Sequence, residues 1–142
     1  MSYLLDTCVL SELMRPTPAA SVSAWLDAYA HQPVFLSVLT VGEIAQGIAK
    51  LAASARKTAL NDWLRQVVLP NYEGRILAVD TAVTLRWGAL RGDLIWLGRS
   101  PAVIDSLLAA TALSHGLTLA TRNVRDFEAL GVTVFNPWDA GS

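Results

Sequence analysis

Four acidic residues stand where a helix or a strand is expected to begin or end, each within apolar or small-residue sequence. These residues are Asp6, Glu43, Asp105 and Asp126. Carboxylates that share a site repel one another, by roughly 4 kcal/mol at about 4 Å in a protein-like dielectric. A fold that gathers several of them therefore usually holds a hard cation such as Mg²⁺ or Mn²⁺. If the four converge, the sequence predicts a metal site.

Asp105 is the acid that is hardest to explain as a structural residue. It is the only charge in residues 101–114, PAVIDSLLAATALS. In the helix that this segment predicts, Asp105 lies in the second turn and shares an apolar face with Leu108 and Ala112. A lone carboxylate in such a place needs a partner, a proton or a metal. We therefore favour a functional role for Asp105.

The other three acids also have structural explanations. Asp6 could cap the helix that follows it. Glu43 follows Thr40 at the spacing of a capping box, in which the Glu side chain reaches back to the first amide of the helix. Asp126 stands in a similar pattern, in the first turn after Asn123. Taken singly, each of these acids could be structural.

Short apolar runs alternate with helical patterns along the chain. Strands are expected at 3–5, 34–36, 76–79, 118–120 and 132–135. Helices are expected at about 7–14, 21–31, 40–53, 55–68, 81–91, 100–115 and 124–130, with a loop at 92–100. This alternation indicates an α/β fold with a mostly parallel five-stranded sheet flanked by helices. Sites in such sheets form at the carboxyl ends of the strands, where all four acids are expected.

The whole chain sets further limits. Its 142 residues suit one compact domain, 1–142. With 53% hydrophobic and only 16% charged residues, it should hide apolar surface in a homo-oligomer or against a protein partner. Its net charge is −1, so the chain lacks the strongly basic character that is typical of nucleic-acid-binding proteins. Cys8 is the single cysteine, which excludes an internal disulfide and fits a reducing cytoplasm. We expect it to be a core residue and not a nucleophile.

Four segments carry a resemblance to a known family. The segments are LLDTCVLSEL, FLSVLTVGEIAQGI, IDSLLAATALSHGLTLATRNVRDF and VFNPW. In this order and spacing they resemble the PIN-domain ribonucleases, above all the VapC toxins of type II toxin–antitoxin systems and their FitB-like branch. The resemblance covers nearly the whole chain. It implies a three-layer PIN fold, with the parallel sheet between two layers of helices.

The resemblance also implies a Mg²⁺-dependent endoribonuclease, in which Mn²⁺ can substitute. The family's first three acids match Asp6, Glu43 and Asp105. Many members carry the fourth acid where this chain has Asn123, whereas the TRN-x-x-DF branch keeps it at Asp126. Supporting polar positions match Thr7, Thr121 and Asn123.

The partners that the resemblance implies are an RNA substrate, a second copy of the chain and a VapB- or FitA-like antitoxin. The antitoxin of such systems wraps apolar grooves and binds operator DNA, so DNA contact would be indirect, in the cytoplasm and without a membrane. We expect the antitoxin to contact the helices around Trp25, Ile44 and Ile48.

Two other classes of protein share parts of this pattern. A phospho-receiver domain also has acids at strand ends, but it needs an acid pair after the first strand and a Lys after the fifth. Asp6 has no acidic neighbour, and Lys50 and Lys57 lie far from the fifth strand. A catalytically weak PIN-fold module that only binds RNA or protein remains the alternative, because Asn123 replaces an acid.

Overall fold

The structure, a computed structural model, describes residues 1–28 and 33–139 and is built on one five-stranded sheet. The strands are β1 Tyr3–Leu5, β2 Val34–Ser37, β3 Ile76–Leu77, β4 Thr118–Ala120 and β5 Val134–Phe135. Their order is β3-β2-β1-β4-β5, and every neighbouring pair is parallel. The predicted α/β fold with a parallel five-stranded sheet is confirmed.

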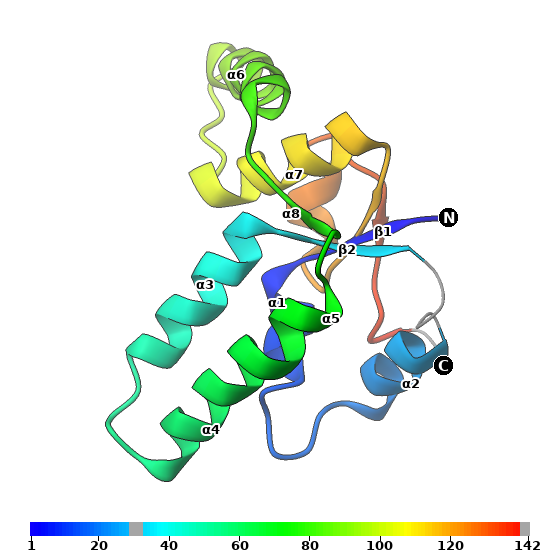
Figure 1. Cartoon of the computed structure of the whole chain (residues 1–142). Helices are drawn as coiled ribbons and strands as arrows, with labels where there is room; N and C mark the ends of the chain where they lie inside the picture. The colour runs from blue at the N-terminus through cyan, green and yellow to red at the C-terminus, as the bar shows by residue number, and fades with distance from the viewer. Residues whose placement is uncertain (29–32, 140–142) are drawn as a thin grey trace.

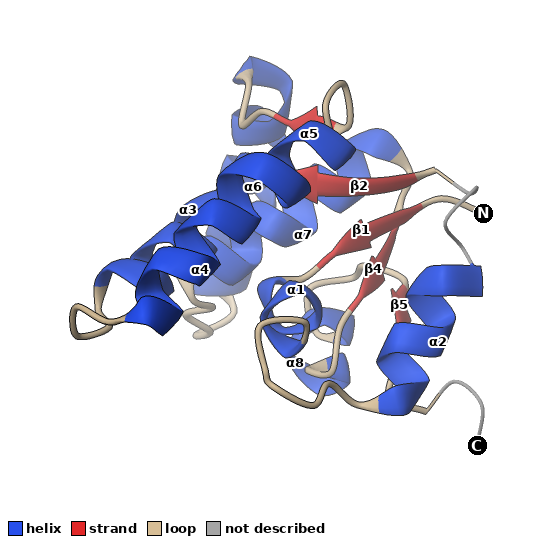
Figure 2. Ribbon diagram, turned by 60° about the horizontal axis from the view of Figure 1, so that its bottom comes forward, coloured by secondary structure: helices blue, strands red, loops and turns tan. Residues whose placement is uncertain are grey.

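Helices form a layer on each face of the sheet (Figures 1 and 2). They are α1 Thr7–Glu12, α2 Ala20–Ala28, α3 Val38–Ala49, α4 Ala55–Trp63, the π-helical turn η1 Leu64–Val68, α5 Leu69–Asn71, α6 Thr81–Trp96, α7 Val103–His115 and α8 Val124–Glu128. The 29–31 end of the second predicted helix lies outside the described residues. Within the residues that the structure describes, no helix has the length and apolar character needed to cross a membrane.

Alternation along β1 divides the core between the two layers. Tyr3 and Leu5 pack with the side chains of α1, α2, α3, α4 and η1. Leu4 points to the other face and packs with those of α6, α7 and α8. Successive strand side chains face opposite sides, so three consecutive apolar residues serve both layers. Because β1 lies in the middle of the sheet and is covered on both faces, its sequence is a continuous apolar run.

The strand order reverses at β1. The chain runs from β1 outward through β2 to β3, then crosses to the other side of β1 for β4 and β5. The ends of β1 and β4 are joined by a hydrogen bond from the Asp6 amide to the Ala120 carbonyl, at 2.9 Å. A crevice at such a switch point is where parallel α/β sheets bind ligands.

Helix α6 is longer than its sequence pattern indicated. It continues to Trp96 instead of ending near Arg91. Its end is a Schellman motif: the Gly98 amide donates to the Ile95 carbonyl at 2.9 Å, and the Arg99 amide donates to the Leu94 carbonyl at 2.8 Å. Gly98 has φ 80°. The sequence pattern predicted that the helix ends before Gly92. Gly92 lies inside the helix, and Gly98 is the glycine that adopts the left-handed conformation at its end.

Two helix starts also differ from the prediction. Helix α3 begins at Val38, because the Ser37 side chain caps it by accepting from the Leu39 amide at 3.0 Å. Thr40 is therefore inside the helix, and the predicted capping box with Glu43 is wrong. Helix α7 begins at Val103, which places Asp105 in its first turn instead of its second.

Alanine substitutions at Gly92 and Gly98 should change the free energy of unfolding in opposite directions. Gly98→Ala should lower the free energy of unfolding by about 1–2 kcal/mol, because a Cβ disfavours the left-handed conformation. Gly92→Ala should raise it by about 0.5–1 kcal/mol, because Gly92 lies inside the helix and an added Cβ meets no described atom within 4 Å. Urea unfolding at equal protein concentration measures both. A destabilised Gly92→Ala variant would contradict the helix boundary described above.

Candidate active site

Asp6 links the ends of β1 and β4. Its carboxylate caps α1, with Oδ1 accepting from the Thr7 amide at 2.8 Å. Its Oδ2 accepts from the Thr121 hydroxyl at 2.8 Å, directly after β4. The side chain is buried, with 6% of its surface exposed. The capping explanation of Asp6 is therefore correct, but it uses only one of the two carboxylate oxygens.

Glu43 belongs to the same constellation through Thr7. The Thr7 hydroxyl donates a short hydrogen bond to Glu43 Oε1, across 36 positions of sequence. Glu43 is half-buried in α3. With the capping box excluded, this contact is what orients the Glu43 carboxylate toward the Asp6 end of the sheet.

Asp105 lies within the electrostatic reach of the other three acids. Burial raises the pKa of the half-buried Asp105 carboxyl above its ordinary value, and the negative charges of Asp6, Glu43 and Asp126 raise this pKa further. A coulombic effect from all three requires that they lie near Asp105. The fold thus gathers four acids that are spread over 120 positions of sequence.

Asp126 approaches Asp105 from the far side of the site. It is exposed in the first turn of α8. Asp105 and Asp126 line one hollow of about 370 Å³, together with Arg99. Arg99 was not among the predicted site residues, because its only signal in the sequence is a single cation at the end of the predicted loop 92–100.

Asn123 and Thr121 connect Asp126 to Asp6. Asn123 occupies the N-cap position of α8, but its side chain makes no capping hydrogen bond there, so that part of the predicted capping pattern is wrong. Its amide donates to the Thr121 hydroxyl oxygen at 3.0 Å, and that hydroxyl donates to Asp6. Thr121 therefore holds the loop after β4 against the Asp6 carboxylate.

Cys8 stands between the core and the acids. Its Sγ lies 3.4 Å from Asp6 Oδ2. Burial raises the pKa of the thiol to about 11, and the charge of Asp6 acts in the same direction, although hydrogen bonds from Arg122 and Thr121 oppose them. The thiol is therefore protonated at neutral pH, which agrees with the expectation that Cys8 is no nucleophile.

The carboxylates do not form a closed cage of ligands. Within residues 1–28 and 33–139, no group of three or more His, Cys, Asp or Glu side chains is drawn together tightly enough to hold an ion by itself. Mg²⁺ needs no such cage, because it usually keeps several waters and takes one or two carboxylates. The mutual repulsion at Asp105 is also what a divalent cation would relieve. The donor set therefore fits a hard cation.

The parallel five-stranded sheet is the one that the resemblance to PIN domains implied. The model of the PIN domain matches residues 3–132, and the chain belongs to the PIN-domain family. Within this family it falls among the FitB- and VapC-type toxins, as the resemblance predicted.

Its similarity to individual members extends over nearly the full length. It is 43% identical to toxin FitB of Neisseria gonorrhoeae, over 95% of this chain and 97% of that protein. It is 37% identical to VapC ribonuclease Y4jK of Sinorhizobium fredii, over 96% and 97% of the two chains. The structure of FitAB bound to an IR36 DNA fragment contains a chain that matches with a TM-score of 0.90 and 40% identity, over 99% of this chain and 98% of that one.

The Thr121 hydroxyl should matter more than an ordinary buried hydroxyl. Thr121→Val removes the donor to Asp6 and the acceptor for the Asn123 amide, and should lower the free energy of unfolding by about 1–3 kcal/mol. Thr111→Val is the matched control, because the buried Thr111 hydroxyl donates only to the Leu107 carbonyl within α7. It should cost less than about 1 kcal/mol. Equal costs in denaturant unfolding would show that Thr121 has no linking role.

Proposed function

We propose that this protein is a Mg²⁺-dependent endoribonuclease, the toxin of a toxin–antitoxin pair. The observation that carries the proposal is the placement of the acids at the switch point of the sheet, where Thr7 bonds both Asp6 and Glu43, and where Asp105 and Asp126 line one hollow. The name of the Sinorhizobium relative, a VapC ribonuclease, supports the reaction class. RNA as the substrate makes the cytoplasm the expected place of action.

The chain's residues have distinct tasks in this proposal. Asp6 and Asp105 would be the main ligands of the ion, with Mn²⁺ as a substitute. Glu43 and Asp126 would complete the outer sphere or hold a second ion. When bound, the ion supplies positive charge against the phosphodiester and acidifies a water for in-line attack.

Hydrogen bonds from Thr7 and Thr121 position the carboxylates of Asp6 and Glu43. Thr121 and the Thr7 amide hold the two oxygens of Asp6 in fixed directions. The Thr7 hydroxyl holds Glu43. Because these bonds exist before substrate arrives, little reorganisation is needed during the reaction, which favours catalysis by electrostatic preorganisation.

RNA cleavage by the purified, partner-free protein tests the proposal. Cellular RNA should be cut at discrete sites with Mg²⁺ or Mn²⁺ and left intact with EDTA. Asp105→Asn should lower the cleavage rate at least about a hundredfold, as loss of one preorganised electrostatic group typically does. Sequencing the new 5′ ends locates the cuts.

Asp62→Asn is the control for charge, because Asp62 is exposed on α4 and lies away from the acids. It should cleave as the wild type does. Full activity of purified Asp105→Asn would refute the assignment. Absence of metal-dependent cleavage and of Mn²⁺ binding would favour the alternative, a PIN-fold module that only binds RNA or protein.

The structure changes the expected contact surface for an antitoxin. Trp25, Ile44 and Ile48 are 5%, 2% and 1% exposed, so these three side chains belong to the core, and an antitoxin would contact other residues of the helices around them. A hollow of about 350 Å³ between α1, α2 and the α4–α5 segment is lined by Leu10, Leu13, Leu26, Val34, Trp63 and Val67, among others. We propose this hollow as the place for an apolar segment of a FitA-like antitoxin.

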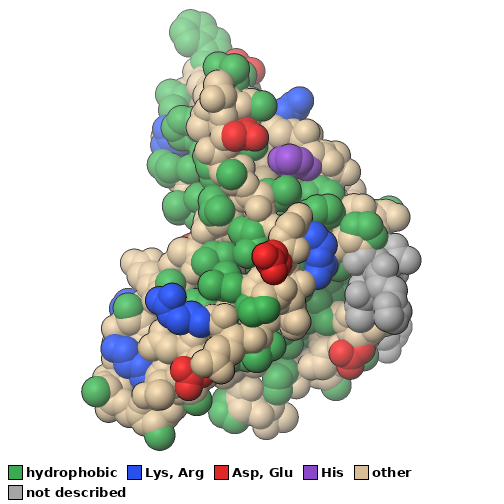
Figure 3. Space-filling view, in the orientation of Figure 1, with side chains coloured by type: hydrophobic (Ala, Val, Ile, Leu, Met, Phe, Trp, Pro, Cys, Tyr) green, Lys and Arg blue, Asp and Glu red, His purple; other side chains and the backbone are tan. Residues whose placement is uncertain are grey.

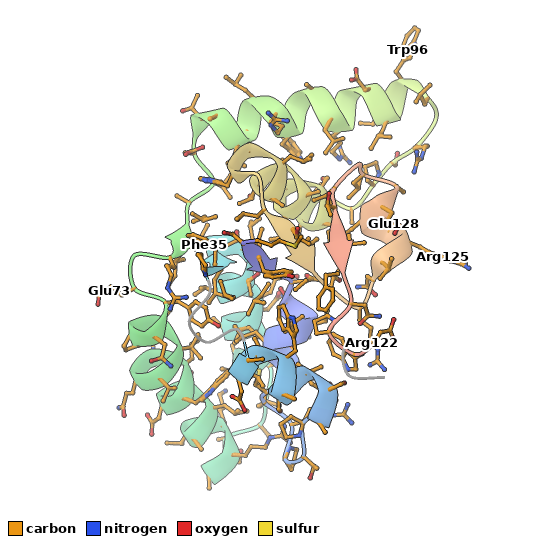
Figure 4. The ribbon with its side chains drawn as sticks, turned by 90° about the vertical axis from the view of Figure 1, so that its right-hand side faces the viewer. Phe35, Glu73, Trp96, Arg122, Arg125 and Glu128 are labelled. Carbon is orange, nitrogen blue, oxygen red and sulfur yellow. The ribbon has the colours of Figure 1, made fainter. Side chains whose placement is uncertain are left out.

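A second copy of the chain is the proposed occupant of another surface. The α6–α7 apolar face, defined here as Leu85, Ile95, Trp96, Leu97, Val103 and Ile104, is exposed. Trp96 projects from the end of α6 (Figure 4), and hydrophobic side chains gather at this upper end of the molecule (Figure 3). Leu85 and Trp96 are 71% and 89% exposed, and their spacing of three helical turns puts them on one side of α6. A homodimer would remove this apolar surface from water.

Trp96→Gln should therefore weaken self-association. Buried Trp side chains are frequent hot spots of interfaces, so the dissociation constant should rise at least about thirtyfold. Sedimentation velocity over a range of concentrations measures this change. Val67→Gln removes an apolar side chain that is 46% exposed from the hollow assigned to the antitoxin, and it should leave self-association unchanged. A monomeric wild type, or equal effects of both substitutions, would contradict the proposed dimer surface.

A further inference from the structure

A stacked arginine lies beside the acids. Arg122 directly follows Thr121 in the loop between β4 and α8. Its guanidinium lies over the ring of Trp138, 4.9 Å from the ring centroid. Trp138 packs against the core, and its amide donates to Asn136 Oδ1 at 2.9 Å. The ring is therefore a fixed platform that limits the positions of the exposed arginine.

The backbone of Arg122 is tied to the candidate active site. Its amide donates to Cys8 Sγ at 3.5 Å, and Cys8 in turn contacts Asp6. The preceding residue, Thr121, donates to the same Asp6 oxygen. These bonds tie the backbone of Arg122 to Asp6, and the stacking on Trp138 limits where its guanidinium lies relative to the acids.

Arg122 stands at the junction of two hollows. One, of about 490 Å³, is lined by Thr7, Cys8, Arg15 and Trp138 among others. The next, of about 580 Å³, is lined by Asn123, Arg125 and Asp126 among others, and Asp126 also lines the hollow of Asp105. The three hollows are therefore neighbours, because each shares a lining residue with the next. Arg122 is the cation that two of them have in common.

We propose that Arg122, stacked on Trp138, is a subsite for a backbone phosphate of single-stranded RNA next to the bond that is cut. The inference rests on the proposed ribonuclease function. An RNA strand brings several phosphates to a site whose own charges are acidic, and a metal can offset only those next to it. A guanidinium binds a phosphate through two parallel hydrogen bonds, for which a fixed planar orientation is an advantage. Arg15 on the opposite wall is less suited, because it already pairs with Glu12 at 3.4 Å.

RNA binding with catalysis switched off tests the subsite. The probe is a short, fluorescein-labelled single-stranded RNA of mixed sequence, titrated in EDTA over a range of salt concentrations. Loss of one phosphate contact should reduce the salt slope of log K by about 0.7, which corresponds to an affinity about fivefold lower at 0.1 M salt. We expect this result for Arg122→Ala. Arg122→Lys keeps the charge and should keep the slope while lowering affinity about two- to threefold, since the planar fork is lost.

Arg56→Ala is the matched control. Arg56 is exposed on α4 and lines none of the three hollows near the acids, so the same loss of charge should leave the affinity and the slope unchanged. Equal losses for both arginines would mean that only the overall charge matters, and this would overturn the subsite. The subsite would also be overturned by an Arg122→Ala variant that binds RNA normally but loses affinity for a copurifying antitoxin.

Cleavage assays separate this inference from the proposed function. A wild type that cuts RNA with Mg²⁺, together with an Arg122→Ala variant that cuts and binds as well as Arg56→Ala, would overturn the subsite alone. A wild type that neither binds nor cuts RNA would overturn both. Support for both is metal-dependent cutting by the wild type, with KM raised about fivefold in Arg122→Ala and kcat nearly unchanged, as loss of one phosphate contact that serves binding predicts.

Discussion

The hydrogen bond from Thr121 to Asp6 is the contact on which the arrangement of the site depends. It joins the ends of β1 and β4 across 115 positions of sequence, at the point where the strand order reverses. The other Asp6 oxygen caps α1, and the next residue, Thr7, holds Glu43 of α3. One buried carboxylate thereby joins the loop after β4 to the start of α1 and, through Thr7, to Glu43 within α3. Satisfying both of its oxygens is what makes its burial tolerable.

Like-charge repulsion is the second constraint, and it explains how the acids are distributed. Asp6 is buried and neutral hydroxyl and amide groups surround it, whereas Asp126 is exposed to water. Asp105 lies between these extremes, and burial together with the other acids raises its pKa. Such an arrangement keeps the acids near one another without requiring direct contact. It leaves room for a cation, its waters and a phosphodiester, which is what the proposed chemistry needs.

Local sequence chemistry predicted the elements well and their ends less well. Strands and most helices follow from apolar period and length, and Gly116 ends α7 in the left-handed conformation as expected. The errors share one cause. Thr40 with Glu43, and Gly92, each fit a local capping or ending rule, but Ser37 and Gly98 fit their positions better once packing is considered. Leu94 is 8% exposed, and burying it requires the helix to continue past Gly92.

The sequence by itself determined the alternation of strands and helices, the class of fold, the family and the four acids, because periodicity, turn residues and motifs are local properties of the chain. Tertiary structure decided what each acid touches. No local pattern could show that Thr7 bonds Glu43, that Asp105 and Asp126 share a hollow, or that Arg122 stacks on Trp138. It also decided that Trp25 is a core residue, and that Trp96, in a segment predicted to be a loop, is an exposed residue at the end of α6. Contacts between distant residues depend on how parallel strands and their helices come together, and only the folded chain fixes those distances.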